Sequence, residues 1–229
     1  MLPMCNHYSA LRGIPEYLEN FIPGVRISDD PLLPGLEIDM YPKKMGAVVT
    51  QSGLDRARAL RMMRWGVPQH FGKGALVTNA REDKLLKSSM WKKAAQLRRC
   101  LVPASAYYEP GPGPVGSRGE VAFRAVGREA FCFAGLWDLD KDGKPCFALV
   151  TTAPNEAAAK FHDRMPVALT DAEALDWVGD QPLPDENLMA LCKGLPAEAL
   201  TFEIIPAKPK SARVPKKKLG DASPDLFGV

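Results

Sequence analysis

Short apolar runs, each bounded by glycine, aspartate or proline, recur through this 229-residue chain and limit the folds that it can adopt. Several of these runs are rich in β-branched or aromatic residues, and such runs between turn-forming residues are typical of strands. The strands predicted in this way span residues 45–50, 60–65, 121–126, 130–136, 146–151 and 202–205. Between two of them, Asp138–Gly143 has the composition of a hairpin turn.

The helical patterns are short. They predict helices over residues 82–87, 89–97, 171–178 and 186–192. The apolar run that begins at Cys100 should end in an exposed turn at Pro110–Pro114, because proline and glycine interrupt a central strand. We therefore predict an α+β fold with one domain over residues 1–205. Its core is a curved, mainly antiparallel, barrel-like sheet flanked by short helices, and a flexible basic tail follows over residues 206–229.

Composition excludes several classes of function. The 30 basic and 27 acidic residues nearly balance, and six of the basic residues lie after Pro206. Residues 1–205 therefore carry almost no net charge, and a DNA-binding face on them depends on where the individual charges lie. The five cysteines form no CxxC pair and the three histidines have no zinc-finger spacing, so we expect no disulfide framework, metal or cofactor. With no export signal and no membrane-length apolar run, a cytoplasmic protein without a membrane partner is expected.

Cys5 stands almost at the start of the chain, in Met4-Cys5-Asn6-His7. A lone cysteine is often buried and inert. If Met4 were the true start and were removed, however, Cys5 would carry a free α-amine, with a pKa near ~8, beside its thiol. Such a residue condenses with aldehydes: the amine forms a Schiff base and the thiolate then closes a five-membered ring. This chemistry needs a proton donor and acceptor nearby.

Three further segments place polar groups beside structural breaks. Asn79 can cap a helix or orient a reacting group, and Arg81 can be solvated or can bind phosphate. Glu109 can be solvated at a strand end, or it can be packed against tyrosines, where desolvation raises a carboxyl pKa and suits it to acid–base work. His162 can be structural or can transfer protons.

Taken in order, these and neighbouring segments make the chain resemble the SOS response-associated peptidase (SRAP) family, whose members shield abasic sites in single-stranded DNA. Seven motifs in the family's order are too many to match by chance. The motifs are Met4-Cys5-Asn6-His7-Tyr8-Ser9, Arg64-Trp65-Gly66-Val67-Pro68, Thr78-Asn79-Ala80-Arg81, Arg98-Arg99-Cys100-Leu101-Val102-Pro103-Ala104, Tyr108-Glu109, Phe133-Ala134-Gly135-Leu136-Trp137 and His162-Asp163-Arg164-Met165-Pro166-Val167.

The resemblance implies a covalent reaction at Cys5. This residue would attack the ring-opened aldehyde of an abasic site and end as a thiazolidine, forming a DNA–protein crosslink. Asn79 would position the cysteine or the sugar, Glu109 would shuttle protons, and His162 would assist proton transfer and crosslink reversal. The same site would remove the residues before Cys5, which gives the family its peptidase name.

The resemblance also implies a single-stranded DNA partner and a protein that acts as a monomer and is associated with the nucleoid when crosslinked. Arg81 and Arg164 would hold phosphates beside the lesion, with Arg64 as a further contact, while Trp65 and Met165 would pack on bases. Stacking and phosphate contacts are sufficient for single-strand binding without base readout.

The chain departs from the family pattern at several positions. Met1–Met4 precede the cysteine, Pro110 stands where the family usually has tryptophan, His7 takes a position often held by arginine, and Glu82-Asp83 adds negative charge beside Arg81. An uncleaved chain lacks the free amine and cannot form a thiazolidine.

Two other functions stay open on the sequence. One is a self-processing thiol amidase that acts on small amides, with Cys5 as nucleophile and His162 as base. The other is a non-covalent module that binds single-stranded DNA through Arg81, Arg164, Trp65 and the basic tail.

Overall fold

The computed structural model describes residues 6–11, 13, 17–18, 21–22, 24–27, 38–52, 57–69, 75–113, 119–179 and 181–207. Cys5 and the four residues before it, as well as residues 208–229 of the predicted tail, lie outside the described residues. None of the described helices is long and apolar enough to cross a bilayer.

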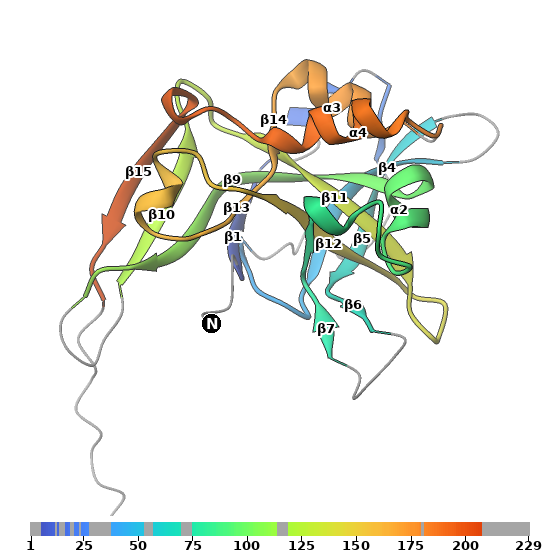
Figure 1. Ribbon diagram of the computed structural model, residues 1–229, viewed down its shortest axis with the longest axis horizontal. Helices are drawn as coiled ribbons and strands as arrows, with labels where there is room; N and C mark the ends of the chain where they lie inside the picture. Colours follow the sequence, from blue (N-terminus) through green and yellow to red (C-terminus); the bar gives the residue numbers. More distant parts are fainter. Residues whose placement is uncertain are drawn as a thin grey trace, which may run out of the picture.

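Thirteen of the described strands form one large sheet, and the other two, β6 and β7, form a small sheet of their own (Figure 1). The strands are β1 (His7–Ala10), β2 (Arg26–Ile27), β3 (Asp39–Met40), β4 (Met45–Ser52), β5 (Ala57–Trp65), β6 (Val67–Pro68), β7 (Leu76–Val77), β8 (Asn79–Arg81), β9 (Arg99–Gly111), β10 (Gly119–Ala125), β11 (Phe131–Leu139), β12 (Pro145–Thr152), β13 (Met165–Pro166), β14 (Ala168–Leu169) and β15 (Leu200–Ile205). The helices are α2 (Lys92–Leu97), α3 (Asp171–Trp177) and α4 (Asp185–Ala190), with the 3-10 turns η1 (Glu82–Lys84), η2 (Ala158–Lys160), η3 (Leu191–Lys193) and η4 (Ala197–Ala199).

Five of these strands close a barrel. β11 pairs with β12, β12 with β5, β5 with β4, β4 with β9, and β9 returns to β11. All of these pairings except that of β12 with β5 are antiparallel. The structure therefore confirms the predicted α+β class with a curved, barrel-like and mainly antiparallel core.

The long strand β9 joins the barrel to the part of the sheet that carries the N-terminal strand. Its first half pairs with β11 and β4, whereas its second half pairs with β1 on one side and β10 on the other. β10 also pairs with β15, so the last strand of the described chain lies beside β10, outside the five barrel strands (Figure 1).

The apolar core divides into two clusters because successive strand residues point to opposite faces. Along β11, Phe133 packs in one cluster with Tyr107 and Phe123, while Ala134 packs in the other with Trp177 of α3. Helices α3 and α4 lie together along one side of the sheet (Figure 1). Burial of both faces explains why the central strands are near-continuous apolar runs.

The structure corrects three local predictions. β9 continues through Pro110, which pairs with Glu120 of β10. Among the described residues the last β9–β1 pair joins Tyr108 and His7, so Pro110 has a described strand neighbour on one side only, where a missing N–H is tolerated. The predicted helix over residues 82–87 is only the 3-10 turn η1 followed by a hydrogen-bonded turn. The proline and glycine content of the first forty residues predicts irregular chain, but this segment contains β1, whose four residues are all buried.

Candidate functional site

A short chain of hydrogen bonds fixes the segment that follows Cys5. Asn6 is the first described residue after it, and its Oδ1 accepts a hydrogen bond of 3.0 Å from the Thr78 hydroxyl. The Thr78 Oγ1 in turn accepts one of 3.3 Å from Nδ2 of Asn79. The Thr78 carbonyl is held by the Trp65 indole N–H at 3.0 Å. The start of β8 is therefore tied both to the core and to the residue next to Cys5.

The register of β1 and β9 brings Glu109 to the same segment. His7 pairs with Tyr108 in an antiparallel register, so the next residue of β9, Glu109, lies on the side of Asn6, the residue before His7. Asn6 and Glu109 line one cavity of about 620 Å³, together with Tyr41, Tyr108, His7, Pro110, Gly119, Glu120, Ile205, Pro206 and Ala207. Glu109 is only 2% exposed, which matches the interpretation of a packed rather than a solvated carboxyl.

His7 is enclosed on both ring faces and at both nitrogens. Its ring stacks between Tyr41 and Tyr108, with centroid distances of 4.4 and 4.0 Å. Its Nδ1 lies 2.9 Å from a Glu120 carboxylate oxygen and its Nε2 lies 3.4 Å from one of Asp39. The imidazole therefore joins β1, β3 and the start of β10, and its nitrogens are turned toward carboxylates instead of a phosphate.

His162 lies in the loop after η2, with its side chain 9% exposed. Its Nδ1 is 2.9 Å from a carboxylate oxygen of Asp163 and accepts a hydrogen bond of 3.2 Å from the backbone N–H of Arg164. The neighbouring Phe161 packs edge-on against Phe202, with ring centroids 5.1 Å apart. Packing on one side and polar contacts on the other fix the orientation of the imidazole.

Each of the three arginines predicted to contact DNA has a carboxylate partner in this structure. Arg64 donates to Asp140 at 3.1 Å, and Arg81 donates twice to Asp83, at 3.0 and 3.2 Å. Arg164 is paired with Glu82, and it also donates to the Thr151 carbonyl at 2.5 Å.

Only one of these pairs is readily accessible. Arg164 is 8% exposed, whereas the side chain of Arg81 is 49% exposed. The hydrogen bonds from Arg81 lower the pKa of the Asp83 carboxyl, so that carboxylate stays ionised and bound to the guanidinium at neutral pH. At so exposed a site the pair is weak, and an anion can exchange with Asp83.

Trp65 and Met165 lie in the core, contrary to the expectation that they pack on bases. Trp65 is 0% exposed, lies edge-on to Tyr8 and stacks with Phe147. Met165 is 2% exposed, and its sulfur accepts a hydrogen bond of 3.4 Å from the backbone N–H of Asn155. Because neither side chain presents a surface to a ligand, their contribution is to support β8 and the loop before β13.

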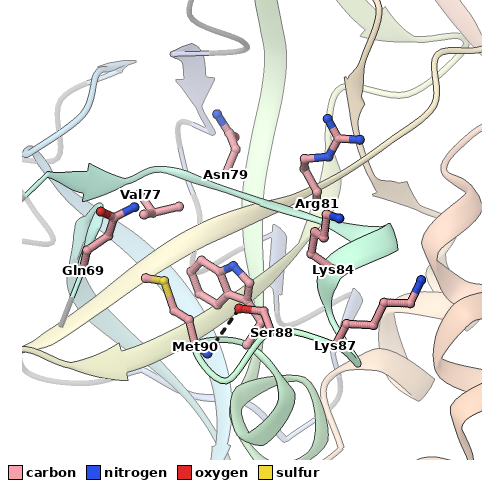
Figure 2. Close-up of a pocket in the computed structure, with 9 residues that line it drawn as sticks. Gln69, Val77, Asn79, Arg81, Lys84, Lys87, Ser88 and Met90 are labelled. Carbon is pink, nitrogen blue, oxygen red and sulfur yellow. Dashed lines mark hydrogen bonds between the residues drawn. The ribbon is translucent and has the colours of Figure 1, made fainter. Parts of the chain in front are cut away.

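A second pocket, of about 490 Å³, has Asn79 in its lining (Figure 2). Its lining consists of Gln69, Val77, Asn79, Arg81, Lys84, Lys87, Ser88, Met90 and Trp91. Lys84 and Lys87 were not among the predicted site residues, although their positions three and six residues after Arg81 were a usable signal. Strand β8, which begins beside the hydrogen bond to Asn6, thus also contributes Asn79 and Arg81 to a basic pocket.

The cysteines of the described chain are not candidates for a nucleophile. Cys100, Cys132, Cys146 and Cys192 are all free and buried. Desolvation raises the pKa of Cys146 to about 11 and that of Cys192 to about 12, and it raises the pKa of the other two thiols as well. These four groups therefore stay protonated and unreactive at neutral pH. In the part of the chain that the structure covers, no His, Cys, Asp and Glu side chains cluster in a way that could hold a metal.

Comparison with solved structures shows the same fold elsewhere. A protein from Bacteroides thetaiotaomicron superposes with a TM-score of 0.75 at 20% identity, covering 88% of this chain and 92% of that one. A protein from Bordetella bronchiseptica gives a TM-score of 0.71 at 23% identity, covering 88% and 99%.

Sequence relatives extend over most of the chain. The abasic site processing protein YoqW of Bacillus subtilis is 25% identical over 207 residues, which are 85% of this chain and 89% of the relative. The abasic site processing protein YobE of the same organism is 28% identical over 212 residues, 87% and 92% of the two chains. The family profile described as SOS response associated peptidase (SRAP) matches residues 4–210. The chain therefore belongs to the SRAP family.

Proposed function

We propose that this protein processes abasic sites in single-stranded DNA by forming a covalent bond to them through Cys5. Family membership and relatives named abasic site processing proteins support this function. The observation that carries it is the fixed position of Asn6. Residue 6 is hydrogen-bonded to Thr78 and shares a cavity with the buried carboxyl of Glu109. In this proposal, the reaction at the adjacent Cys5 uses that carboxyl as its proton-transfer group.

The proposed reaction consumes an aldehyde and releases water. Once residues 1–4 are removed, the Cys5 amine attacks the aldehyde carbon of the ring-opened sugar, and loss of one water gives an imine. The Cys5 thiolate then adds to the imine carbon while the nitrogen takes up a proton, which closes a thiazolidine. Both steps move protons, and a positioned acid–base group accelerates such steps by about 10²–10⁴-fold.

Glu109 is the proposed proton shuttle, since it lines the cavity next to Asn6. Asn79 positions the N-terminal segment through Thr78. His162, oriented by Asp163, assists proton transfer and reversal of the crosslink. The self-processing step uses the same thiol: it attacks the Met4 carbonyl to give a thioester and the free amine, and water then hydrolyses the thioester.

The DNA strand is held chiefly by Arg81 in this proposal, because Arg81 is the most exposed of the three arginines. A phosphate replaces the Asp83 carboxylate on its guanidinium. Arg64, about a third exposed, is an outer contact. Arg164 acts through its bonds to Glu82 and Thr151, which tie η1 to β12 and keep β8 in place.

The test uses chain whose intact mass shows Cys5 as the first residue. This protein is mixed with a uracil-containing oligonucleotide that has been treated with uracil glycosylase, and a heat-stable product is sought on a denaturing gel. Cys5→Ala should abolish the product. When residue 5 is made the first residue, Cys5→Ala and Cys5→Ser both keep the α-amine but lack the thiol, so each should give only an imine that borohydride can trap. Absence of any product from the processed wild type would refute the proposal.

The same experiment separates the other functions. Binding of DNA that is unchanged in Cys5→Ala, with no covalent product, would indicate a non-covalent single-strand binding module. Turnover of small amides without preference for abasic DNA would indicate a thiol amidase.

A further inference from the structure

Three basic side chains line the pocket beside Asn79. Arg81, Lys84 and Lys87 follow one another at intervals of three residues, from the end of β8 through the 3-10 turn η1 into the turn after it. The turn after η1 continues this arrangement, because the backbone N–H groups of Lys87 and Ser88 both donate to the Lys84 carbonyl, at 3.2 and 2.8 Å. All three cations consequently border the pocket of about 490 Å³ (Figure 2).

The pocket has an excess of positive charge. None of the described residues that line it carries a carboxylate. Within the described residues neither the Lys84 nor the Lys87 ammonium takes part in an ion pair, whereas Arg64 and Arg164 are each bound to a carboxylate. Two unneutralised ammonium groups beside an exchangeable Arg81 are suited to bind a phosphate group.

The remaining wall suits the rest of a nucleotide. Val77, Met90 and Trp91 supply apolar surface, and Gln69 and Ser88 supply polar groups (Figure 2). A volume of about 490 Å³ exceeds what a phosphate alone needs, and it falls in the size range of small-molecule sites. The combination of cations on one edge and apolar surface opposite them matches a phosphate attached to a sugar and base.

We propose that this pocket binds the nucleotide adjacent to the abasic site, with Lys84 and Lys87 as its phosphate contacts. The inference rests on the proposed function. Asn79 and Arg81 connect the two places: Asn79 holds, through Thr78, the segment next to Cys5, and both residues also line the pocket. When the abasic site of a DNA strand is bound at Cys5, the neighbouring phosphate therefore lies beside Arg81, Lys84 and Lys87.

The salt dependence of binding measures these contacts directly. Each phosphate contact on single-stranded DNA contributes about −0.7 to the slope of log affinity against log salt. The double variant Lys84→Gln/Lys87→Gln should therefore reduce the slope by about 1.4, so that between 50 and 200 mM salt the wild-type affinity falls about sevenfold more than that of the variant. Lys92→Gln/Lys93→Gln is the matched control, since these exposed lysines of α2 do not line the pocket.

The measurement is fluorescence anisotropy of a labelled, undamaged single-stranded oligonucleotide, with melting temperatures to show that both double variants are folded. A slope reduced in the pocket variant and unchanged in the control supports the lysine contacts. Equal slopes for the wild type and the folded pocket variant would overturn them. This assay does not involve the lesion, so it can fail or succeed independently of the proposed function.

Placement next to the lesion is tested by crosslinking at limiting DNA. Two abasic oligonucleotides are compared, one ending at the lesion on its 5′ side and the other on its 3′ side. On the oligonucleotide that lacks the nucleotide bound in the pocket, the wild type and the lysine variant should crosslink at the same slow rate. On the other oligonucleotide, the wild type should still crosslink faster than the variant. If the difference persists on both, or if the wild type gives no crosslink at all, the pocket does not bind the nucleotide beside the lesion.

Discussion

Replacing Thr78 with valine tests how the structure positions Cys5. Valine has nearly the shape of threonine but removes two hydrogen bonds, the one donated to Asn6 at 3.0 Å and the one accepted from Asn79 at 3.3 Å. A neutral hydrogen bond contributes a net of about 1 kcal/mol. Because the Thr78 carbonyl stays bound to the Trp65 indole, the backbone of β8 should not move.

If both bonds hold the N-terminal segment in its reactive position, their loss costs about 2 kcal/mol. The fraction of molecules with the segment in that position, and hence the crosslinking rate, then falls by about 30-fold. The rate is followed under single-turnover conditions on a denaturing gel with an abasic oligonucleotide, using chain processed to Cys5. The melting temperature should fall by about 4–8 °C. Thr78→Ser keeps the hydroxyl and should retain a rate within about threefold of the wild type. A folded Thr78→Val protein that crosslinks at the wild-type rate would refute the positioning role, and an equal loss in Thr78→Ser would show that the hydroxyl is not the cause.

Three further predictions follow from the same geometry. Glu109→Gln should slow crosslinking by about 10²–10⁴-fold while the affinity for undamaged single-stranded DNA, measured by anisotropy, stays within about twofold; an unchanged rate would remove Glu109 from the reaction. Asp83→Asn frees Arg81 from a surface ion pair and should tighten single-strand binding about twofold to fivefold, whereas the exposed Asp176→Asn should have no effect; equal affinities for the two variants would contradict the exchange of carboxylate for phosphate. Iodoacetamide at pH 8 should add one label to the native chain, at Cys5, and five after unfolding, because burial holds the pKa of the other four thiols at about 11 or higher; more than one label on the native chain would show that a buried thiol is accessible.

The strands that could be predicted from the sequence are those whose local pattern decides their structure. β11 and β12 are apolar runs joined by a turn rich in aspartate and glycine, and they pair as a hairpin. β1 could not be predicted in this way, because it is buried on both sides by pairing with β3 and β9, whose positions depend on distant parts of the chain.

Pro110 shows a similar limit. Proline normally ends a central strand, and only the tertiary arrangement shows that the described pairing of β1 with β9 stops at Tyr108, before Pro110.

The site residues divide along the same lines. Residue type was enough to single out Asn79 and Glu109, but the contact that unites the site joins Asn6 to Thr78, 72 residues apart, and no local pattern contains it. The family resemblance implied that Trp65 packs on bases, as aromatic side chains do in single-strand binding. Sequence alone does not reveal which face of a strand points inward when both faces are mixed, and Trp65 points into the core.

The mass of the covalent product tests the central claim most directly. A thiazolidine at Cys5 requires an adduct whose mass equals that of the processed chain plus that of the abasic oligonucleotide, less one water. Because the closed ring has no C=N bond, treatment with borohydride should leave this mass unchanged. An adduct that gains two hydrogens on reduction would reveal an imine that never closes. No adduct, from protein whose first residue is Cys5, would contradict the account altogether.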